Sequence, residues 1–214
     1  MNAQLHNLIN RQHQRMRELR DDARDLASTV ADEVWDKFEV EIEEATSDGY
    51  IFDGAGMTKI SLASTLAMNY DEAFERNVLG FFERQQQELK NALPDEAGFY
   101  DSRLDLAGLR KGLKLRRHAD EMIGKAIEEA KPGLIGMIFA CTDPTSDDWD
   151  KEHIDNARRL RERLLGLRSR LLEMMVEETA NVVRAARLAY IGWLDTLPGK
   201  LDAHQAAAVK ESAQ

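Results

Sequence analysis

Long amphipathic periodicity without internal proline is the feature that most constrains the fold of this 214-residue chain. A proline inside a helix costs about 3 kcal/mol, and all the prolines here fall outside the strongly periodic segments. They are Pro94, Pro132, Pro144 and Pro198. Together with the glycines they divide the chain into four predicted helices. The approximate ranges are 3–46, 58–93, 102–131 and 149–196.

The first and last of these helices carry apolar seams at steps of three and four residues, the spacing of one helix face. In the first helix the seam is Met16, Leu19, Ala23, Leu26 and Val30, followed at steps of four by Val34, Phe38 and Ile42. In the last helix it is Ala157, Leu160, Leu164, Leu167, Leu171 and Met174. Glu178 and Asn181 occupy the next two seam positions, so a bundle contact is favoured over a continuous two-stranded rod.

The length of these segments limits the shape of the molecule. A helix of about 44 residues is roughly 65 Å long, which is about twice the width of a compact small domain. Either such a helix kinks, or the bundle is elongated, or a second copy or a partner covers the rest of its apolar stripe. We expect an all-α, elongated and oligomeric bundle of about four long amphipathic helices with coiled-coil-like packing. Residues 1–198 are predicted to form a single helical-bundle domain, and residues 199–214 a flexible C-terminal tail.

The glycine-rich stretch SDGYIFDGAGMTK, residues 47–59, lies between the first two predicted helices. A phosphate-binding Walker loop needs Gly-x4-Gly-Lys, whereas here Gly54 and Gly56 are separated by one residue and Lys59 stands three residues further. An EF-hand loop counted from Asp48 would have glutamate at its twelfth position, where this chain has Lys59. Both patterns fail, which leaves an interhelical connection as the predicted structure.

The motifs of metal-binding helical bundles are also missing from the sequence. A di-iron site uses Glu-x-x-His on two helices, and none of the five histidines has a glutamate three residues before it. The nearest pattern is a single Asp-x-x-His that joins Asp150 and His153. We therefore predict no catalytic, metal-binding or cofactor-binding residues, and we expect that the protein is not an enzyme.

Charge is segregated along the chain, whose formal net charge is −10. Residues 32–48 hold eight acidic residues and one lysine, whereas residues 158–170 hold six arginines and one glutamate, so the two blocks could pair across helices. Basic side chains form a candidate patch for nucleic-acid phosphates or an acidic partner. The candidates are Arg110, Lys111, Lys114, Arg116, Arg117, Arg158, Arg159, Arg161 and Arg163. The alternative is a solvated face paired with the acidic block, which the acidic net charge and the lack of interleaved aromatic residues favour.

The most apolar segment is LIGMIFA, residues 134–140. Seven residues cannot cross a bilayer, and no window approaches the roughly 20 apolar residues of a membrane span. One interpretation is a short helix that plugs the end of the bundle core. The other is an exposed tip that docks a partner or a membrane surface. The candidate docking residues are Leu134, Ile135, Met137, Ile138 and Phe139.

These observations favour a non-enzymatic helical interaction protein, such as an adaptor, an assembly factor or a structural subunit of a larger complex. Its expected partners are another protein and further copies of the chain, without integral membrane association. The alternative is a nucleic-acid-associated subunit that uses the basic patch. The single cysteine, Cys141, excludes an intramolecular disulfide framework and fits a reducing compartment. We therefore expect the protein in the cytoplasm, or in the host cytoplasm or virion if it is viral.

Overall fold

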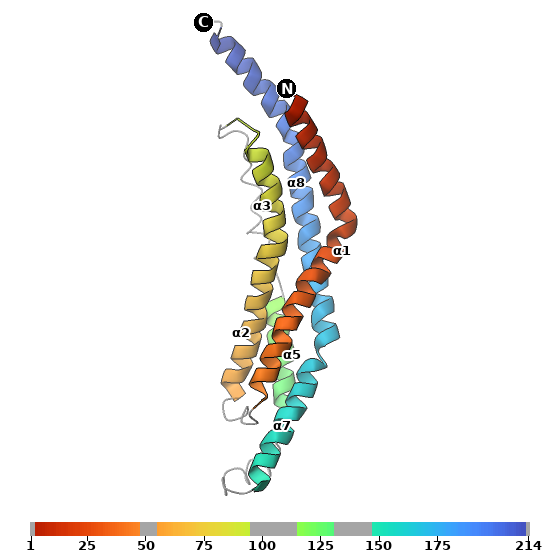
Figure 1. Cartoon of the computed structure of the whole chain (residues 1–214), viewed down its shortest axis with the longest axis vertical. Helices are drawn as coiled ribbons and strands as arrows, with labels where there is room; N and C mark the ends of the chain where they lie inside the picture. The colour runs from red at the N-terminus through yellow and green to blue at the C-terminus, as the bar shows by residue number, and fades with distance from the viewer. Residues whose placement is uncertain (1–2, 48–54, 95–114, 131–146, 213–214) are drawn as a thin grey trace. The chain divides into compact units, whose positions relative to one another are not determined.

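The computed structural model describes residues 3–47, 55–94, 115–130 and 147–212, and all the regular elements in these ranges are helices (Figure 1). They are α1 (Ala3–Ala45), α2 (Ala55–Phe74), the π-helix η2 (Glu75–Leu79), α3 (Gly80–Lys90), α5 (Leu115–Ala130), α7 (Asp147–Leu165) and α8 (Arg168–Ser212). The predicted all-α bundle of long amphipathic helices is therefore confirmed. The first part of the helix predicted at 102–131 lies outside the described residues.

The helix predicted at 58–93 consists of three consecutive elements, α2, η2 and α3, which follow one another without a gap. Phe74, Val78 and Phe82 are buried at steps of four residues along it. In an α-helix each step of four turns the side chain by about 40° relative to the previous one. Because a π turn contains more residues than an α turn, η2 reduces this drift and keeps the three side chains on the buried face.

The buried faces of α1 and α8 follow the predicted seams with two shifts of one residue. In α1 Ala27 is buried and Leu26 is half-buried, while in α8 Met175 is buried and Met174 is half-buried. Heptad spacing predicts Leu26 and Met174, but a straight helix drifts by about 20° per heptad, so the buried position moves to the next residue. The other predicted seam residues are buried, apart from Leu167.

The helix predicted at 149–196 is interrupted at Gly166 and Leu167, which separate α7 from α8. The N–H of Gly166 donates to the Glu162 carbonyl (2.9 Å), whereas the N–H of Leu167 donates to the Leu164 carbonyl, only three residues back (3.0 Å). A Cβ at position 166 would lie 3.3 Å from two carbonyl oxygens of the preceding turn, which is closer than ordinary contact. Glycine therefore suits this break, and the break leaves Leu167 only half-buried.

The helix end predicted near Thr196 is wrong, because α8 continues through Pro198 to Ser212. Proline removes one backbone hydrogen bond and clashes with the preceding turn, at a cost of about 3 kcal/mol. Large apolar side chains on both sides of this proline are buried, namely Trp193, Leu194, Leu197 and Leu201. Burial of one such side chain contributes about 1.5–3 kcal/mol, so the packing outweighs the cost of proline. The flexibility expected of residues 199–214 stays a prediction.

The chain divides into two compact units, and the predicted single domain of residues 1–198 stays a prediction. Unit 1 comprises residues 1–27, 74–112 and 179–214. In unit 1, α1 and α8 lie side by side and antiparallel, because His13 contacts Asp195 while Met16, further along α1, contacts Arg187, which comes earlier in α8 (Figure 1). The largest buried side chains of this unit are Met16, Phe74, Phe82, Leu89, Tyr190 and Trp193.

Unit 2 has an apolar core of its own, surrounded by polar contacts between its helices. It comprises residues 28–73 and 113–178. The largest buried side chains are Trp35, Phe38, Ile42, Leu66, Ile123 and Ile127. Lys37 Nζ lies 3.6 Å from Glu72 Oε2 and joins α1 to α2, while the N–H of Leu115 donates to Glu178 Oε2 (3.1 Å) and joins α5 to α8. Glu178, which interrupts the predicted seam, therefore binds a neighbouring helix.

Replacement of Pro198 by alanine should stabilise the protein. The alanine N–H restores the backbone hydrogen bond within α8 and removes the steric clash, while a more flexible unfolded chain offsets part of the gain. We expect the free energy of unfolding, measured by urea denaturation, to rise by about 1–3 kcal/mol. A less stable Pro198→Ala variant would contradict the continuous helix described here.

Candidate functional site

A chain of polar side chains runs from the surface of unit 1 into its core and joins α1, α3 and α8. Gln12 is fully buried, and its Nε2 donates to Glu88 Oε2 (2.9 Å). Arg15 Nη1 donates to the same Glu88 oxygen (2.7 Å) and to Gln85 Oε1 (2.6 Å). The hydroxyl of Tyr190 lies 3.5 Å from Gln12 Oε1 and completes the chain. Because buried polar groups are costly without partners, the contacts of Gln12 and Gln85 favour this arrangement of the helix faces, whereas the Arg15–Glu88 pair lies at the surface.

Tyr190 occupies the apolar end of this polar chain. Its ring is fully buried and lies between two aromatic neighbours, with ring centroids 6.0 Å from Phe82 and 5.3 Å from Trp193. Burial first, and the Glu88 carboxylate second, raise the pKa of the Tyr190 hydroxyl well above its ordinary value of about 10, while Arg15 acts in the opposite direction. The tyrosine therefore stays protonated at neutral pH and can donate to Gln12.

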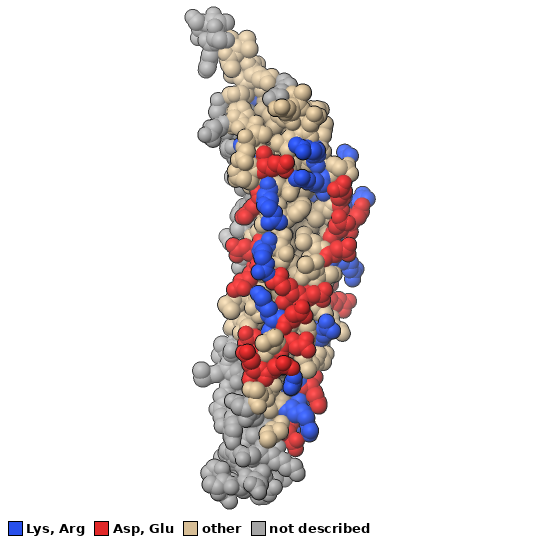
Figure 2. Space-filling view, in the orientation of Figure 1, with Lys and Arg blue, Asp and Glu red and all other residues tan. Residues whose placement is uncertain are grey.

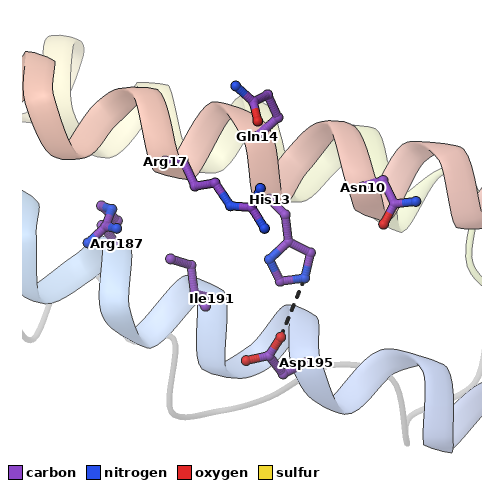
Figure 3. Close-up of a pocket in the computed structure, with 7 residues that line it drawn as sticks. All are labelled: Asn10, His13, Gln14, Arg17, Arg187, Ile191 and Asp195. Carbon is purple, nitrogen blue, oxygen red and sulfur yellow. Dashed lines mark ion pairs between the residues drawn. The ribbon is translucent and has the colours of Figure 1, made fainter.

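A polar groove lies beside this network, between α1 and α8 on the surface of unit 1 (Figure 3). Its volume is about 700 Å³, within the usual range of roughly 300–1,000 Å³ for ligand pockets. The lining residues are Asn10, His13, Gln14 and Arg17 of α1 with Arg187, Ile191 and Asp195 of α8. We call this set of residues the α1–α8 groove.

Asp195 and Gln14 of the α1–α8 groove already have partners within the chain. His13 Nε2 lies 3.4 Å from Asp195 Oδ1, the contact marked by the dashed line in Figure 3. Gln14 Nε2 donates to Glu18 Oε1 (3.0 Å) on the exposed side of α1. The groove pairs a histidine with an aspartate, but the described residues of its lining include no hydroxyl or thiol that could act as a nucleophile beside them.

The two arginines of the groove are arranged differently. Arg187 Nε donates to the backbone carbonyl of Met16, which holds the side chain against α1. Arg17 extends from α1 into the space between the helices, beside His13 (Figure 3). Neither guanidinium has a carboxylate partner among the residues that the structure describes. A guanidinium donates up to five hydrogen bonds and matches carboxylate and phosphate geometry, so the groove is suited to an anionic group.

The basic patch predicted from the sequence is only partly described, and the arginines seen there have partners within the chain. Arg117 Nε lies 3.8 Å from Glu121 Oε1, and Arg158 Nη2 lies 2.9 Å from Asp155 Oδ1. The other three described side chains are also engaged: Arg159 donates to Asn156, Arg161 pairs with Glu43, and Arg163 pairs with Glu129. The Arg161 contact joins the basic block to the acidic block, as the alternative interpretation expects.

Charge is mixed elsewhere on the described surface. Figure 2 shows acidic and basic side chains interspersed on the face in view, where no large area carries basic side chains alone. In unit 2, Arg168 adds a contact of another kind, because its guanidinium carbon lies 6.0 Å from the ring centroid of Trp35. In the predicted patch, the carboxylates bound to Arg158, Arg161 and Arg163 compete with phosphate for these arginines.

Several predicted site residues, together with Cys141 and most of the predicted interhelical loop, fall outside the described residues. These are the side chains of Arg110, Lys111, Lys114 and Arg116, the apolar tip of Leu134, Ile135, Met137, Ile138 and Phe139, Cys141, and most of the loop at 47–59. Within the described ranges, no group of three or more His, Cys, Asp or Glu side chains could hold a metal ion. Over those same ranges no helix is long and apolar enough to cross a membrane.

The α1–α8 groove was not predicted from the sequence. His13 and Arg17 are four residues apart, and Arg187, Ile191 and Asp195 are also spaced by four, so each set lies on one helix face. This spacing was visible within the predicted helices. The antiparallel pairing of α1 with α8, which brings the two sets together, depends on contacts between residues far apart in the chain and cannot be read from local periodicity.

Comparisons of the chain with protein families, curated proteins and solved structures found no match.

The buried Tyr190 predicts a loss of stability at alkaline pH. Because its pKa is raised in the folded state, the unfolded chain loses this proton first, at a pH near 10, and the folded state is progressively disfavoured above that pH. Above that pH, the contribution of Tyr190 to the free energy of unfolding falls by as much as about 1.4 kcal/mol per pH unit. Urea denaturation between neutral pH and pH ~11 should show a shallower decline for Tyr190→Phe than for wild type. Equal slopes would contradict this assignment.

Proposed function

We propose that the protein is a non-enzymatic helical interaction protein, acting as an adaptor, an assembly factor or a structural subunit, and that it associates with copies of itself. The observation that supports this most is a surface of α8 in unit 1 that faces away from the core. Small side chains recur there at alternating steps of four and three residues. They are Ala185, Ala189, Gly192, Thr196, Gly199 and Ala203, which we call the small-residue face. All but the half-buried Thr196 are exposed.

This spacing averages 3.5 residues, the repeat that keeps one helix face against another in a left-handed coiled coil. Small side chains at such positions allow two helices to approach closely. Leu188, which is 63% exposed, lies beside this face and offers an apolar side chain to a second helix. These features favour helix-to-helix contact over a role for this face as an ordinary solvated surface, which would carry charged residues.

The two glycines of the small-residue face add to this argument. Glycine in a helix interior costs about 1 kcal/mol relative to alanine. A Cβ added at Gly192 or Gly199 would meet no described atom within 4 Å beyond its chain neighbours and the backbone of its own helix, so packing against other described parts of the protein does not require glycine at either position. Contact with another molecule would supply such a requirement.

A nucleic-acid-associated role is the weaker alternative. The described arginines of the predicted patch have partners inside the chain, and the net charge of −10 opposes binding to a polyanion. The expected cytoplasmic location rests on the single cysteine alone. Absorbance at 260 and 280 nm during purification tests the alternative, because nucleic acid that dissociates at high salt would move this role to first place.

Gly192→Glu should disrupt self-association without unfolding the protein. The new side chain projects into open space, and glutamate has a better helix propensity, so the free energy of unfolding should stay the same or rise by about 0.5–1 kcal/mol. Size-exclusion chromatography with light scattering should show an assembly for wild type and a 24.3 kDa monomer for the variant. Ser64→Glu, at an exposed position of α2, is the matched control and should assemble like wild type.

Three results would count against self-association through this face. A wild-type monomer at all accessible concentrations would remove the homo-oligomer from the proposal. An assembly that Gly192→Glu and Ser64→Glu leave equally intact would show that another surface is used. An assembly weakened equally by both substitutions would indicate a general effect of added negative charge.

A further inference from the structure

The α1–α8 groove combines uncommitted positive charge with nearby apolar surface. Arg17 has no hydrogen bond or ion pair within the described part of the chain, and Arg187 uses Nε on the Met16 carbonyl, which leaves its two terminal nitrogens for another acceptor. Among the described residues that line the groove, Asp195 is the only acidic one, and it already contacts His13. The groove therefore has an unbalanced positive charge in a protein whose net charge is −10.

The apolar component of the groove comes from α8. Ile191 projects from α8 toward α1 between the two arginines and His13 (Figure 3). Leu188 is exposed three residues before it, on the outer side of the same helix. A ligand that bound both arginines would therefore also lie close to apolar side chains. Charged and apolar groups side by side suit an amphipathic helix that binds in a groove between two helices.

We infer that the α1–α8 groove binds an acidic amphipathic helix of a protein partner. Arg17 and Arg187 pair with its carboxylates, and Ile191 and Leu188 contact its apolar face. The choice of carboxylate follows from charge complementarity, because a planar guanidinium can bind a carboxylate through two parallel hydrogen bonds. The choice of a helix follows from the open groove between two antiparallel helices. This inference rests on the proposed function and adds to it the chemistry of one partner.

The inference can be tested with a defined probe on the full-length protein. The probe is a fluorescent synthetic helix of about 20 residues, long enough to be helical in water, with leucine on one face and glutamate at the flanking positions. A second peptide carries glutamine in place of every glutamate. A fluorescent single-stranded DNA of similar charge is the third probe. Binding is measured by fluorescence anisotropy at low and at high salt.

The protein variants separate the groove from the rest of the surface. Arg17→Gln combined with Arg187→Gln removes both charges from the groove. Arg24→Gln removes one charge from an exposed position of α1 that does not line the groove, and it serves as the control. Thermal unfolding followed by circular dichroism establishes that each variant is folded before binding is measured.

The expected result is binding of the glutamate peptide to wild type and to Arg24→Gln, with affinity at least about tenfold lower for the double variant. The glutamine peptide should bind weakly to all three proteins. High salt should lower the affinity of wild type for the glutamate peptide. A charge-reversed variant, Arg17→Glu combined with Arg187→Glu, provides a further test. This variant should bind a peptide with lysine in place of every glutamate more tightly than it binds the glutamate peptide.

Other outcomes would overturn the inference. Equal affinity of wild type and the double variant would show that the groove does not recognise the carboxylates. Preference for the DNA probe, lost in the double variant, would assign the groove to nucleic acid. Failure of the glutamate peptide to bind wild type would reject this partner chemistry, while self-association that depends on Gly192 would leave the proposed function intact.

Discussion

The polar contacts of the buried Gln12 and Tyr190 in unit 1 favour the helix arrangement that leaves the proposed surfaces available for function. Gln12 is fully buried, and its bond to Glu88 favours the arrangement of α1 and α3 that keeps it paired. Arg15 binds Glu88 and Gln85 at the edge of this core, where Arg15 and Glu88 are 43% and 37% exposed. Tyr190 extends the same chain to α8. An apolar core alone tolerates rotation of a helix by part of a turn more readily than such a set of contacts does.

Two surfaces follow from this arrangement. Once Tyr190 and Trp193 face the core, the small-residue face of α8 must point away from it, because the two sets occupy opposite sides of one helix. The residues between those sides, Arg187 and Ile191, then lie along α1 and form the α1–α8 groove with Arg17. The interaction surfaces that we propose are therefore consequences of the core of unit 1.

Periodicity predicted the helical class and most of the buried residues, because an apolar stripe indicates both where a helix lies and which side it buries. It failed where packing outweighed a local preference. Pro198 predicts a helix end, yet Leu197 and Leu201 are buried on either side of it and α8 continues. The break at Gly166 was not predicted either, because the apolar seam continues through Leu167 without interruption.

The α1–α8 groove could not be predicted from the sequence, for a different reason. The basic block of the sequence includes Arg158, Arg161 and Arg163, and in the folded protein each of these arginines contacts a carboxylate. The arginines of the groove, Arg17 and Arg187, are isolated in the sequence and become neighbours only through antiparallel packing. Charge density along a chain therefore did not indicate which charges the folded protein leaves available.

Amide hydrogen exchange measured by mass spectrometry at low and high protein concentration tests the central claim most directly. If helices associate through the small-residue face, protection in residues 185–203 should increase with concentration, because contact with a second copy suppresses local opening of α8. Protection elsewhere in unit 1 should change less. An increase confined to another segment, or no change in α8 while the protein assembles, would contradict the account.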